Sequence, residues 1–538
     1  MRRPVSRRTF LAGAAGLVAA ACSSGNDATP PTTSSTTPGT TTTPTATTPT
    51  TTTPAATSTL VPTPAADLAG EPFTLGVASG EPLADSVVLW TRLVPDPADP
   101  TGGMPDETFD VAYDIALDEN FTTIVASGLA IADSDYAHSV HVEPGDLEPA
   151  TTYFYRFRIG EHTSPTGRTR TLPAEGTDPF RFALTTCQDP QFGEYAAWAD
   201  IAADDELDAV IFTGDYIYEL PPLDFSPQGD GRRMWTTPPP ADLAGFRARY
   251  AQVKQDPSLQ AAHRALPFFT MWDDHEITDN YWADGPGQFD SAGGDFASRR
   301  AAAYQAWWEH QPARTPAPTA TGVALHRSVR VGDLAEFFLI DTRQFADEPP
   351  CRDTSTFDFG TGCDERDDPG RTLLGEDQVA WLTAGLRAST ARWTSLVSPS
   401  MFAGLDARDA GEEEPKYYLE AWDGYPAERA RVADALADAP NPIVLSGDYH
   451  ASFVLDVGPG FGRDVICPEI MATAISSSPF ATDYTAANPH VQYFNPDNGY
   501  TKCTVTADRW EADYRSVGDI WNPTDRLDTV ASFEFPAR

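Results

Sequence analysis

Five short apolar runs in the C-terminal two thirds of the chain each end directly in charged or metal-binding side chains. The runs are Phe180 to Thr185, Asp208 to Thr213, Phe268 to Trp272, Glu336 to Ile340 and Ile443 to Leu445. They alternate with helical stretches, which is typical of a sheet covered by helices. Ligands of such sheets bind in the crevice at the carboxyl ends of the strands. The pattern therefore predicts an α/β body over residues 178–538 in which these side chains meet at one site.

Residues 69–174 have a different pattern, of short β-type runs separated by turn residues. The runs are Ser86 to Thr91, Phe109 to Leu117, Thr123 to Ile131, Ser139 to Val142 and Thr151 to Arg158. Their spacing predicts a β-sandwich of the fibronectin or immunoglobulin type. Catalytic side chains do not gather in this region, so we expect it to serve in packing or spacing.

The first 22 residues are predicted to be an export signal. Arg7-Arg8 forms a twin-arginine start, and the apolar run from Leu11 to Ala21 is too short to serve as a transmembrane helix. Cys22 lies where a lipoprotein would be cleaved and lipidated, with simple secretion as the alternative. Residues 23–68 are mostly Thr, Pro, Ser, Ala and Gly and predict an extended tether. We therefore expect an exported protein, anchored at the cell surface or secreted.

The charge of the chain limits its partners. It has 37 basic and 78 acidic residues and a formal net charge of −41. Because nucleic acids and anionic membranes are themselves polyanions, stable binding of either to this surface is disfavoured. A local cationic or metal-lined pocket would still accept a small phosphate ester.

The cysteines fit an oxidising compartment. Cys351 and Cys363 flank a polar loop and are predicted to form a disulfide bond. Cys467 and Cys503 are a plausible second pair. This leaves Cys187 as an unpaired thiol directly after a strand, either as a buried apolar residue or as a metal ligand.

Three motifs at strand ends carry the chemistry. Gly214-Asp215 is followed by a phenol at Tyr218, an acidic cluster surrounds His275, and Asp448 precedes His450 by two residues. Each motif alone is explained by a helix cap or a solvated acidic turn. Adjacent acids at the end of a buried strand repel each other unless a positive charge lies between them. Together the motifs therefore predict bound cations.

These motifs resemble those of the calcineurin-like metallophosphoesterases, and most closely those of the PhoD-type alkaline phosphatase family. The matching segments are Thr185 to Asp189, Gly214 to Glu219, Trp272 to Glu276, Asp341 to Gln344, Trp422 to Tyr425 and Ser446 to His450. The resemblance covers residues 73–538 and implies a β-sandwich followed by an α/β metallophosphoesterase sandwich. Phe345-Ala346 stands where the family usually has Tyr-Arg, so a phosphate contact from a second arginine is not expected there.

The resemblance implies a ferric ion with calcium ions beside it. The implied ligands are Cys187, Asp215, Tyr218, Asp274, Asn280, Asp448 and His450. Cys187, Tyr218 and His450 would bind iron, and Asp215 would bridge to the neighbouring metal. The remaining ligands would bind calcium, Asn280 through a carbonyl oxygen. Metal chemistry agrees with this division, because carboxylates suit calcium whereas thiolate and imidazole suit transition metals.

The implied function is hydrolysis of phosphate esters by metal-activated water, in an exported alkaline phosphatase and phosphodiesterase. His275 is expected to protonate or hydrogen-bond the leaving oxygen, and orientation of a metal ligand is its alternative role. Arg343 is expected to hold the phosphate, with a structural ion pair as the alternative. One alternative function is a related enzyme specialised for nucleotides or phospholipids. The other is a tethered surface-binding protein with a structural metal site.

Overall fold

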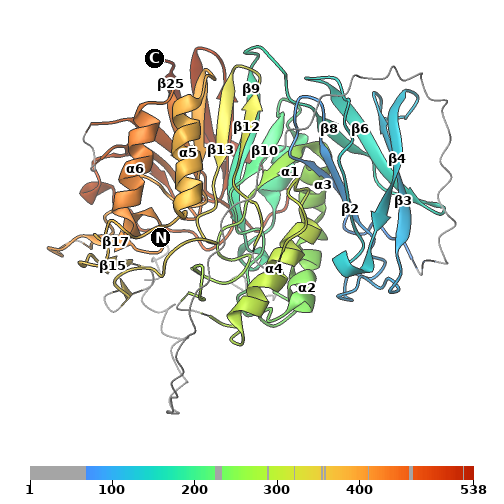
Figure 1. The fold of residues 1–538 in the computed structure, drawn as a ribbon, viewed down its shortest axis with the longest axis horizontal. Helices are drawn as coiled ribbons and strands as arrows, with labels where there is room; N and C mark the ends of the chain where they lie inside the picture. The colour runs from blue at the N-terminus through green and yellow to red at the C-terminus, as the bar shows by residue number, and fades with distance from the viewer. Residues whose placement is uncertain are drawn as a thin grey trace, which may run out of the picture. The chain divides into compact units, whose positions relative to one another are not determined.

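The computed structural model describes most of the chain after the predicted tether (Figure 1). The described residues are 68, 70–223, 233–287, 290–319, 322–352, 355–356, 359–409, 411–459, 464–524 and 526–538. The predicted export signal, the cysteine at its end and residues 23–67 of the tether lie outside them. Within the described residues, each helix is too short or too polar to serve as a membrane span.

The first folded part is a two-layered antiparallel β-structure. One layer is a five-stranded sheet of β4, β3, β6 and β7, with β8 paired to β6. Its strands are β3 (Phe109–Ala116), β4 (Ile124–Ala132), β6 (Thr152–Ile159), β7 (His162–Thr163) and β8 (Gly167–Arg170), and η2 (Ser134–Tyr136) follows β4. Alternate residues of β6, including Tyr155 and Phe157, point into a core shared with β1 (Val77–Gly80), β2 (Val88–Arg92) and β5 (Ser139–Val142). The predicted sandwich is confirmed.

A ten-stranded mixed sheet forms the first layer of the second part. Its order is β25-β24-β23-β9-β10-β11-β1-β2-β5, with β21 paired to β9. The further strands are β9 (Phe180–Gln188), β10 (Ala209–Phe212), β11 (Pro267–Thr270), β21 (Ala474–Ser476), β23 (Gly499–Val505), β24 (Arg509–Val517) and β25 (Leu527–Pro536). Parallel pairing of Ser79 with Pro267 and of Gly80 with Phe268 joins β1 to β11. One layer of the sandwich therefore continues the ten-stranded sheet, which the sequence did not predict.

A seven-stranded sheet forms the opposite layer, in the order β12-β13-β16-β18-β20-β19-β22. Its strands are β12 (Arg327–Val331), β13 (Ala335–Leu339), β16 (Trp393–Val397), β18 (Pro442–Ser446), β19 (Ser452–Val457), β20 (Cys467–Met471) and β22 (Val491–Asn495). The four strands β13, β16, β18 and β20 run parallel. A small antiparallel sheet contains β14 (Ser355–Thr356), β15 (Phe359–Thr361) and β17 (Lys416–Tyr418).

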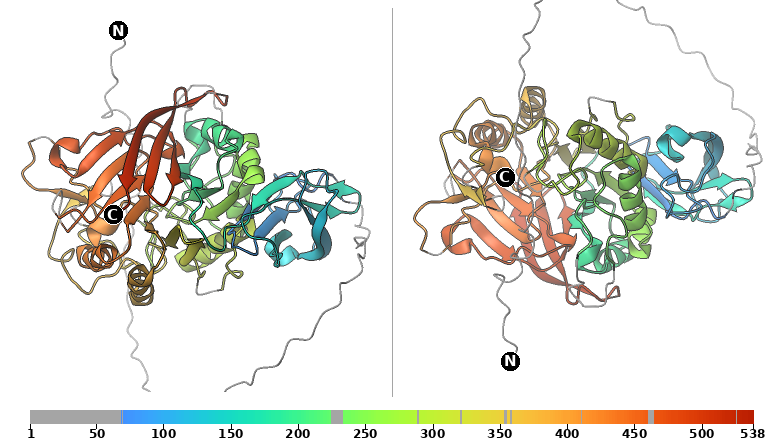
Figure 2. Two further views of the ribbon diagram at one scale, coloured as in Figure 1. Left: turned by 90° about the horizontal axis from the view of Figure 1, so that it is seen from above. Right: turned by 90° about the horizontal axis from the view of Figure 1, so that it is seen from below.

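The two large sheets pack face to face, and helices cover their outer faces (Figures 1 and 2). Helices α1 (Ala196–Ala203), α2 (Leu243–Lys254), α3 (Pro257–Ala265) and α4 (Phe296–His310) lie on the first sheet, and α5 (Glu376–Ala388) and α6 (Pro426–Ala437) lie on the second. The 3-10 helices are η3 (Pro190–Phe192), η4 (Trp422–Gly424) and η5 (Thr485–Ala487). Leu184 and Leu445 meet in the core between the sheets, while Ala183 and Val444 face the helices. Burial on both faces explains why the central strands are continuous apolar runs.

The cysteine predictions have different outcomes. Cys351 and Cys363 form a disulfide bond with their Cα atoms 5.9 Å apart, as predicted. The pairing of Cys467 with Cys503 is wrong, since both thiols are free. Cys467 lies on β20 of the second sheet and packs under the helices, whereas Cys503 lies on β23 of the first sheet and packs between the sheets. Each serves as a small buried apolar side chain.

Candidate metal centre

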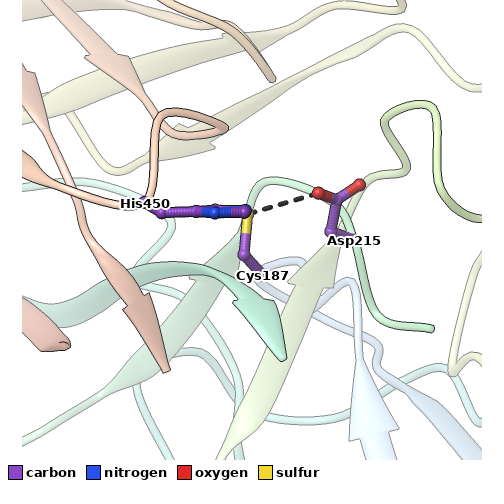
Figure 3. A group of neighbouring side chains, drawn as sticks. All are labelled: Cys187, Asp215 and His450. Carbon is purple, nitrogen blue, oxygen red and sulfur yellow. Dashed lines mark hydrogen bonds between the residues drawn. The ribbon is translucent and has the colours of Figure 1, made fainter. Parts of the chain in front are cut away.

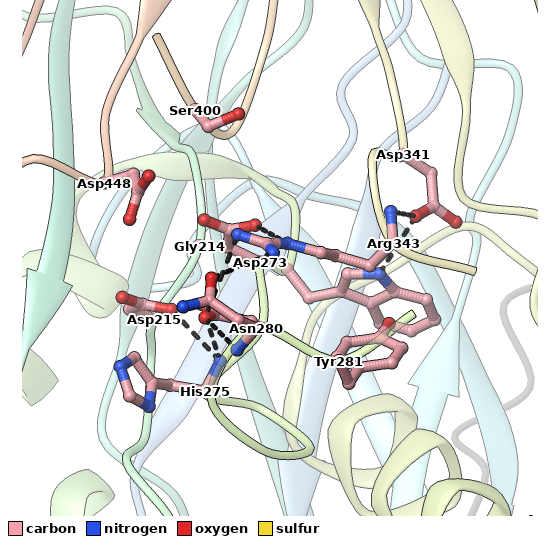
Figure 4. Close-up of polar contacts among 12 residues, drawn as sticks. Gly214, Asp215, Asp273, His275, Asn280, Tyr281, Asp341, Arg343, Ser400 and Asp448 are labelled. Atoms are coloured by element: carbon pink, nitrogen blue, oxygen red, sulfur yellow. Dashed lines mark hydrogen bonds and ion pairs between the residues drawn. The ribbon is translucent and has the colours of Figure 1, made fainter. Parts of the chain in front are cut away.

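The carboxyl ends of strands from both sheets meet and bring together residues that are far apart in the sequence (Figure 4). The positions are Cys187 at the end of β9, Asp215 after β10, Asp273 to His275 after β11, Arg343 after β13, and Asp448 and His450 after β18. The β9, β10 and β11 segments belong to one sheet, and the β13 and β18 segments belong to the other. The site therefore depends on the stacking of the two sheets as well as on strand order.

Cys187, Asp215 and His450 form the first ligand group (Figure 3). One donor atom from each residue lies within 4.8 Å of the other two. Sγ of Cys187 is 3.3 Å from Oδ2 of Asp215. The Tyr218 hydroxyl is 3.1 Å from Oδ2 of Asp215 and 3.1 Å from Nε2 of His450. A thiol, a phenol, an imidazole and a carboxylate thus converge, and this donor set suits a transition metal.

Asp215 also belongs to a second group, with Asp274 and His275. Donor atoms of these three residues again lie within 4.8 Å of one another. Burial raises the pKa of Asp448 well above its usual value, and the nearby carboxylates of Asp273 and Asp274 raise it further. Asp448 therefore adds a third carboxyl group beside Asp273 and Asp274. Asp215 is therefore shared by the two candidate groups.

Gly214 and Glu276 lock together the turns that follow β10 and β11. The buried carboxylate of Glu276 accepts hydrogen bonds from the backbone N–H groups of Asp215 (3.1 Å), Tyr216 (2.6 Å) and Asp273 (3.0 Å). Gly214 has a φ of 132°, and a Cβ atom there would lie 2.5 Å from the backbone nitrogen of Asp273. Only glycine allows the two turns to approach this closely. The sequence did not single out Glu276, because spacing alone does not show that its carboxylate turns inward.

Five of the predicted ligand residues have left-handed backbone conformations. Their φ values are 51° for Cys187, 62° for Asp215, 51° for Asn280, 78° for Asp448 and 53° for His450. For residues other than glycine such conformations cost about 1–3 kcal/mol each, and they concentrate at functional sites. Part of the backbone strain of the described residues therefore lies at these strand ends, although residues elsewhere, such as Phe121 and Ala137, have similar φ values.

Burial shifts the protonation of the first group strongly. It raises the pKa of the Cys187 thiol well above its usual value, and the Asp215 carboxylate raises it further. Burial also raises the pKa of Asp215 well above its usual value and lowers the pKa of His450 to about 4. A cation favours thiolate and carboxylate and so counteracts these upward shifts. The protonation of the group and the binding of a cation are thus tightly linked.

Unpaired oxygens at the site also fit cation binding. Oδ2 of Asp273 and Oδ2 of Asp448 are buried and have no hydrogen-bond partner among the described residues. Leaving a buried acceptor unsatisfied costs about 1–3 kcal/mol, and more when it is charged. Hard cations take carboxylate oxygens as their ligands. The residues present therefore fit both kinds of metal that the sequence predicted.

His275 is held by a carboxylate that the sequence did not single out. Its Nδ1 lies 2.8 Å from Oε2 of Glu219, whose Oε1 accepts a hydrogen bond from the backbone of Asp279 at 2.7 Å. Burial lowers the pKa of His275, but the carboxylates of Glu219 and Asp274 outweigh it and hold that pKa well above its usual value. The imidazole is therefore held by Glu219, and the neighbouring carboxylates favour its protonated form.

Arg343 forms a buried ion pair within the site. Its Nε is 2.6 Å from Oδ1 of Asp273, and both side chains are 2% exposed. Its Nη1 is 3.2 Å from Oδ1 of Asn280, and the Asn280 backbone donates to Oδ2 of Asp274 at 2.6 Å. Burial opposes ionisation of Asp274, but Arg343 lowers the pKa of that carboxyl to about 2. Arg343 thus favours the ionised form of Asp274.

The fold and the site together define a class of protein. Two stacked, helix-covered sheets present two ligand groups that share one carboxylate, an arrangement suited to metal-assisted hydrolysis. The chain belongs to the PhoD-like phosphatase family, which it matches over residues 182–514, and residues 56–173 match the N-terminal domain of PhoD-like phosphatases.

Comparison with one protein sequence and one solved structure shows how similar the chain is to known members of this family. The chain is 40% identical over 468 residues to alkaline phosphatase D of Bacillus subtilis, covering 84% of this chain and 79% of that protein. Its fold is similar to the solved structure of PhoD, with a TM-score of 0.82 and 40% identity over 88% of this chain and 92% of the other. The predicted family and fold class are confirmed.

Proposed function

We propose that this protein is an exported, metal-dependent phosphatase that hydrolyses phosphate monoesters and diesters. The observation that carries the proposal is the position of Asp215, which belongs both to the group with Cys187 and His450 and to the group with Asp274. If each group held a cation, the two would share Asp215, and paired metal ions of this kind would act on one phosphoryl group. Membership of the phosphatase family supports the reaction class.

The donor chemistry supports a different metal at each group. We assign Fe³⁺ to Cys187, Asp215, Tyr218 and His450, and Ca²⁺ to Asp215, Asp274 and Asp448, with Asn280 contributing a carbonyl oxygen. The soft thiolate and the imidazole favour a transition metal, and the carboxylates favour calcium. When bound, such cations offset the charge of the phosphoryl group and acidify water.

Side chains of the protein would donate a proton to the leaving oxygen and hold the phosphate and the metal-binding turns in place. Glu219 fixes Nδ1 of His275, and we assign Nε2, which lies 3.7 Å from Oδ1 of Asp279, to the leaving oxygen as a proton donor. Nη2 of Arg343 has no hydrogen-bond partner among the described residues, although Oδ2 of Asp274 is 3.8 Å away. We assign that Nη2 to a phosphate oxygen. Glu276 keeps the Asp215 and Asp273 turns at a constant separation.

The N-terminal residues support export. Arg7-Arg8 and the apolar run after it have the pattern of a twin-arginine signal, a route that carries proteins folded before transport. Such a route suits a protein that acquires its metals inside the cell. We propose that the body is held at the surface through Cys22 or released.

The experiment is turnover of one chromogenic phosphate monoester and one diester by the metal-loaded protein. We expect turnover of both, loss of turnover with a chelator, and loss of turnover and metal in Asp215→Asn. Asp434→Asn, which changes an exposed acid on α6, is the matched control and should behave as the wild type. Bound metal without turnover of either ester would contradict the proposal and favour a structural metal site.

A further inference from the structure

Four aromatic side chains beside the metal centre have no part in the proposed reaction. We call Phe359, Tyr418, Tyr449 and Phe480 the aromatic wall. Their ring centroids form a closed circuit, at 5.4 Å from Phe359 to Tyr418, 5.2 Å from Tyr418 to Tyr449, 5.2 Å from Tyr449 to Phe480 and 6.1 Å from Phe480 back to Phe359. The rings come from β15, from β17, from the turn after β18 and from the loop after β21. Four separate segments thus build one surface.

The aromatic wall is bonded to the candidate ligands. The Tyr418 hydroxyl donates to Oδ1 of Asn280 at 3.3 Å. The backbone N–H of Phe480 donates to the carbonyl of His450 at 3.4 Å, and the His450 ring contacts the carbonyl of Ser478 at 2.8 Å. Tyr449 lies between Asp448 and His450 in the sequence. The wall therefore has a fixed place next to the site where a phosphoryl group would bind.

The rings also reach the surface. Phe359, Tyr418 and Phe480 are half-buried, while Tyr449 beneath them is 6% exposed. With the phosphoryl group at the metal centre, the alcohol part of an ester would extend toward a neighbouring surface. Aromatic rings stack on other flat rings, and this attraction depends little on the identity of the ring.

We propose that the aromatic wall is the subsite for the alcohol part of the ester, and that it favours aryl and nucleoside phosphates over small alkyl phosphates. The inference rests on the proposed function, since it places the phosphoryl group at the metal centre. An alkyl alcohol such as glycerol has no ring to stack on the half-buried side chains of Phe359, Tyr418 and Phe480, and the Tyr418 hydroxyl already bonds to Asn280.

Binding of two phosphonates that are not hydrolysed tests the subsite separately from leaving-group reactivity. Calorimetry on the metal-loaded protein should give a phenylphosphonate dissociation constant about tenfold below that of methylphosphonate, as expected for one stacked ring. Phe480→Leu keeps the apolar volume and removes the ring, so it should bring this ratio to about twofold or less. Tyr418→Leu is a second variant with the same expected change. Tyr493→Leu, a half-buried aromatic on β22 in the core between the sheets, is the control and should keep the ratio.

The outcomes separate this inference from the function on which it rests. Equal affinity for the two phosphonates in the wild type, or an unchanged ratio in both variants, would overturn the subsite and leave the phosphatase proposal intact. Failure of both phosphonates to bind the metal-loaded protein would overturn both proposals.

Discussion

Cys187 is the residue whose role is tested most directly. It lies at the end of β9, it is fully buried, and its sulfur is 3.3 Å from a carboxylate oxygen of Asp215. Burial and the Asp215 carboxylate both raise the pKa of this thiol, so a thiolate here is unfavourable unless a cation is bound. Cys187→Ala should therefore lose the visible absorbance of a thiolate–metal bond and reduce activity by more than about 100-fold. Absorbance spectra and ester turnover of the purified variant measure both effects.

Cys467→Ala is the control for this prediction. Cys467 is also buried and free, but it packs in the core under α5 and α6. Its removal should leave colour and activity unchanged. An unchanged spectrum in Cys187→Ala would show that the thiol is not a ligand.

Lys254 should make the stability of the folded protein depend on pH, separately from the metal centre. It is 2% exposed, and its Nζ lies 4.3 Å from the Trp90 ring centroid and 5.2 Å from that of Tyr216. Burial lowers its pKa from 10.5 to about 7. Because the unfolded chain keeps this proton between pH 7 and 10.5 while the folded chain does not, stability rises with pH in that window.

Lys254→Met should abolish this dependence. As the pH rises across this window, the unfolding free energy of the wild type should increase relative to that of the variant by about 1.4 kcal/mol per pH unit. The variant should therefore be the more stable protein below pH 7 and lose that advantage toward pH 10.5. Denaturant unfolding at several pH values measures the difference. Lys416→Met, at a lysine paired with Glu412 on the surface, should show no such slope, and a parallel pH profile in Lys254→Met would contradict the assignment.

At the scale of elements, the turns after β10 and β11 decide whether the ligands meet. Gly214→Ala would place a methyl group 2.5 Å from the backbone nitrogen of Asp273, in a backbone conformation unfavourable to alanine. We expect a loss of about 1–3 kcal/mol of stability from the strain and, because displacement by about 1 Å misplaces reacting groups, a fall in activity of about 100-fold. Thermal melting and turnover measure the two effects. Gly145→Ala, where a Cβ would meet no atom within 4 Å, is the matched control. Full activity in Gly214→Ala would mean that the close approach is not required.

At the scale of the whole molecule, the N-terminal sandwich and the catalytic body share one sheet. β1 pairs with β11, and the Trp90 indole donates to the carbonyl of Glu309 at 3.0 Å. A chain beginning at residue 178 would leave the edge of β11 unpaired, and exposed strand edges promote aggregation.

We expect this truncated chain to be insoluble or to melt well below the full protein. A chain beginning at residue 68 lacks only the predicted signal and tether, so it should melt at the wild-type temperature. Soluble yield and circular dichroism compare the two. A stable, soluble chain from residue 178 would show that the sandwich is a separable module.

The sequence predicted most of the strands closely. The β5 strand has the predicted bounds, and strands near the other predicted runs are shifted by a few residues at most. Cys187, Asp215 and His450 were predicted to share a metal, and their donor atoms lie within 4.8 Å. Glu219 and Glu276 were not singled out, because hydrogen bonds to an imidazole or to backbone N–H groups leave no pattern in sequence spacing.

The sequence by itself determined which strands form and which chemistry follows them, because apolar periodicity and residue type act over a few neighbouring residues. Tertiary structure alone decided that the strands divide between two sheets, that β1 extends one of them, and that Cys467 and Cys503 face different cores. It also decided that Arg343 pairs with Asp273. These features depend on which distant segments pack together, and burial, close backbone approach and ion pairing between such segments exist only once the chain is folded.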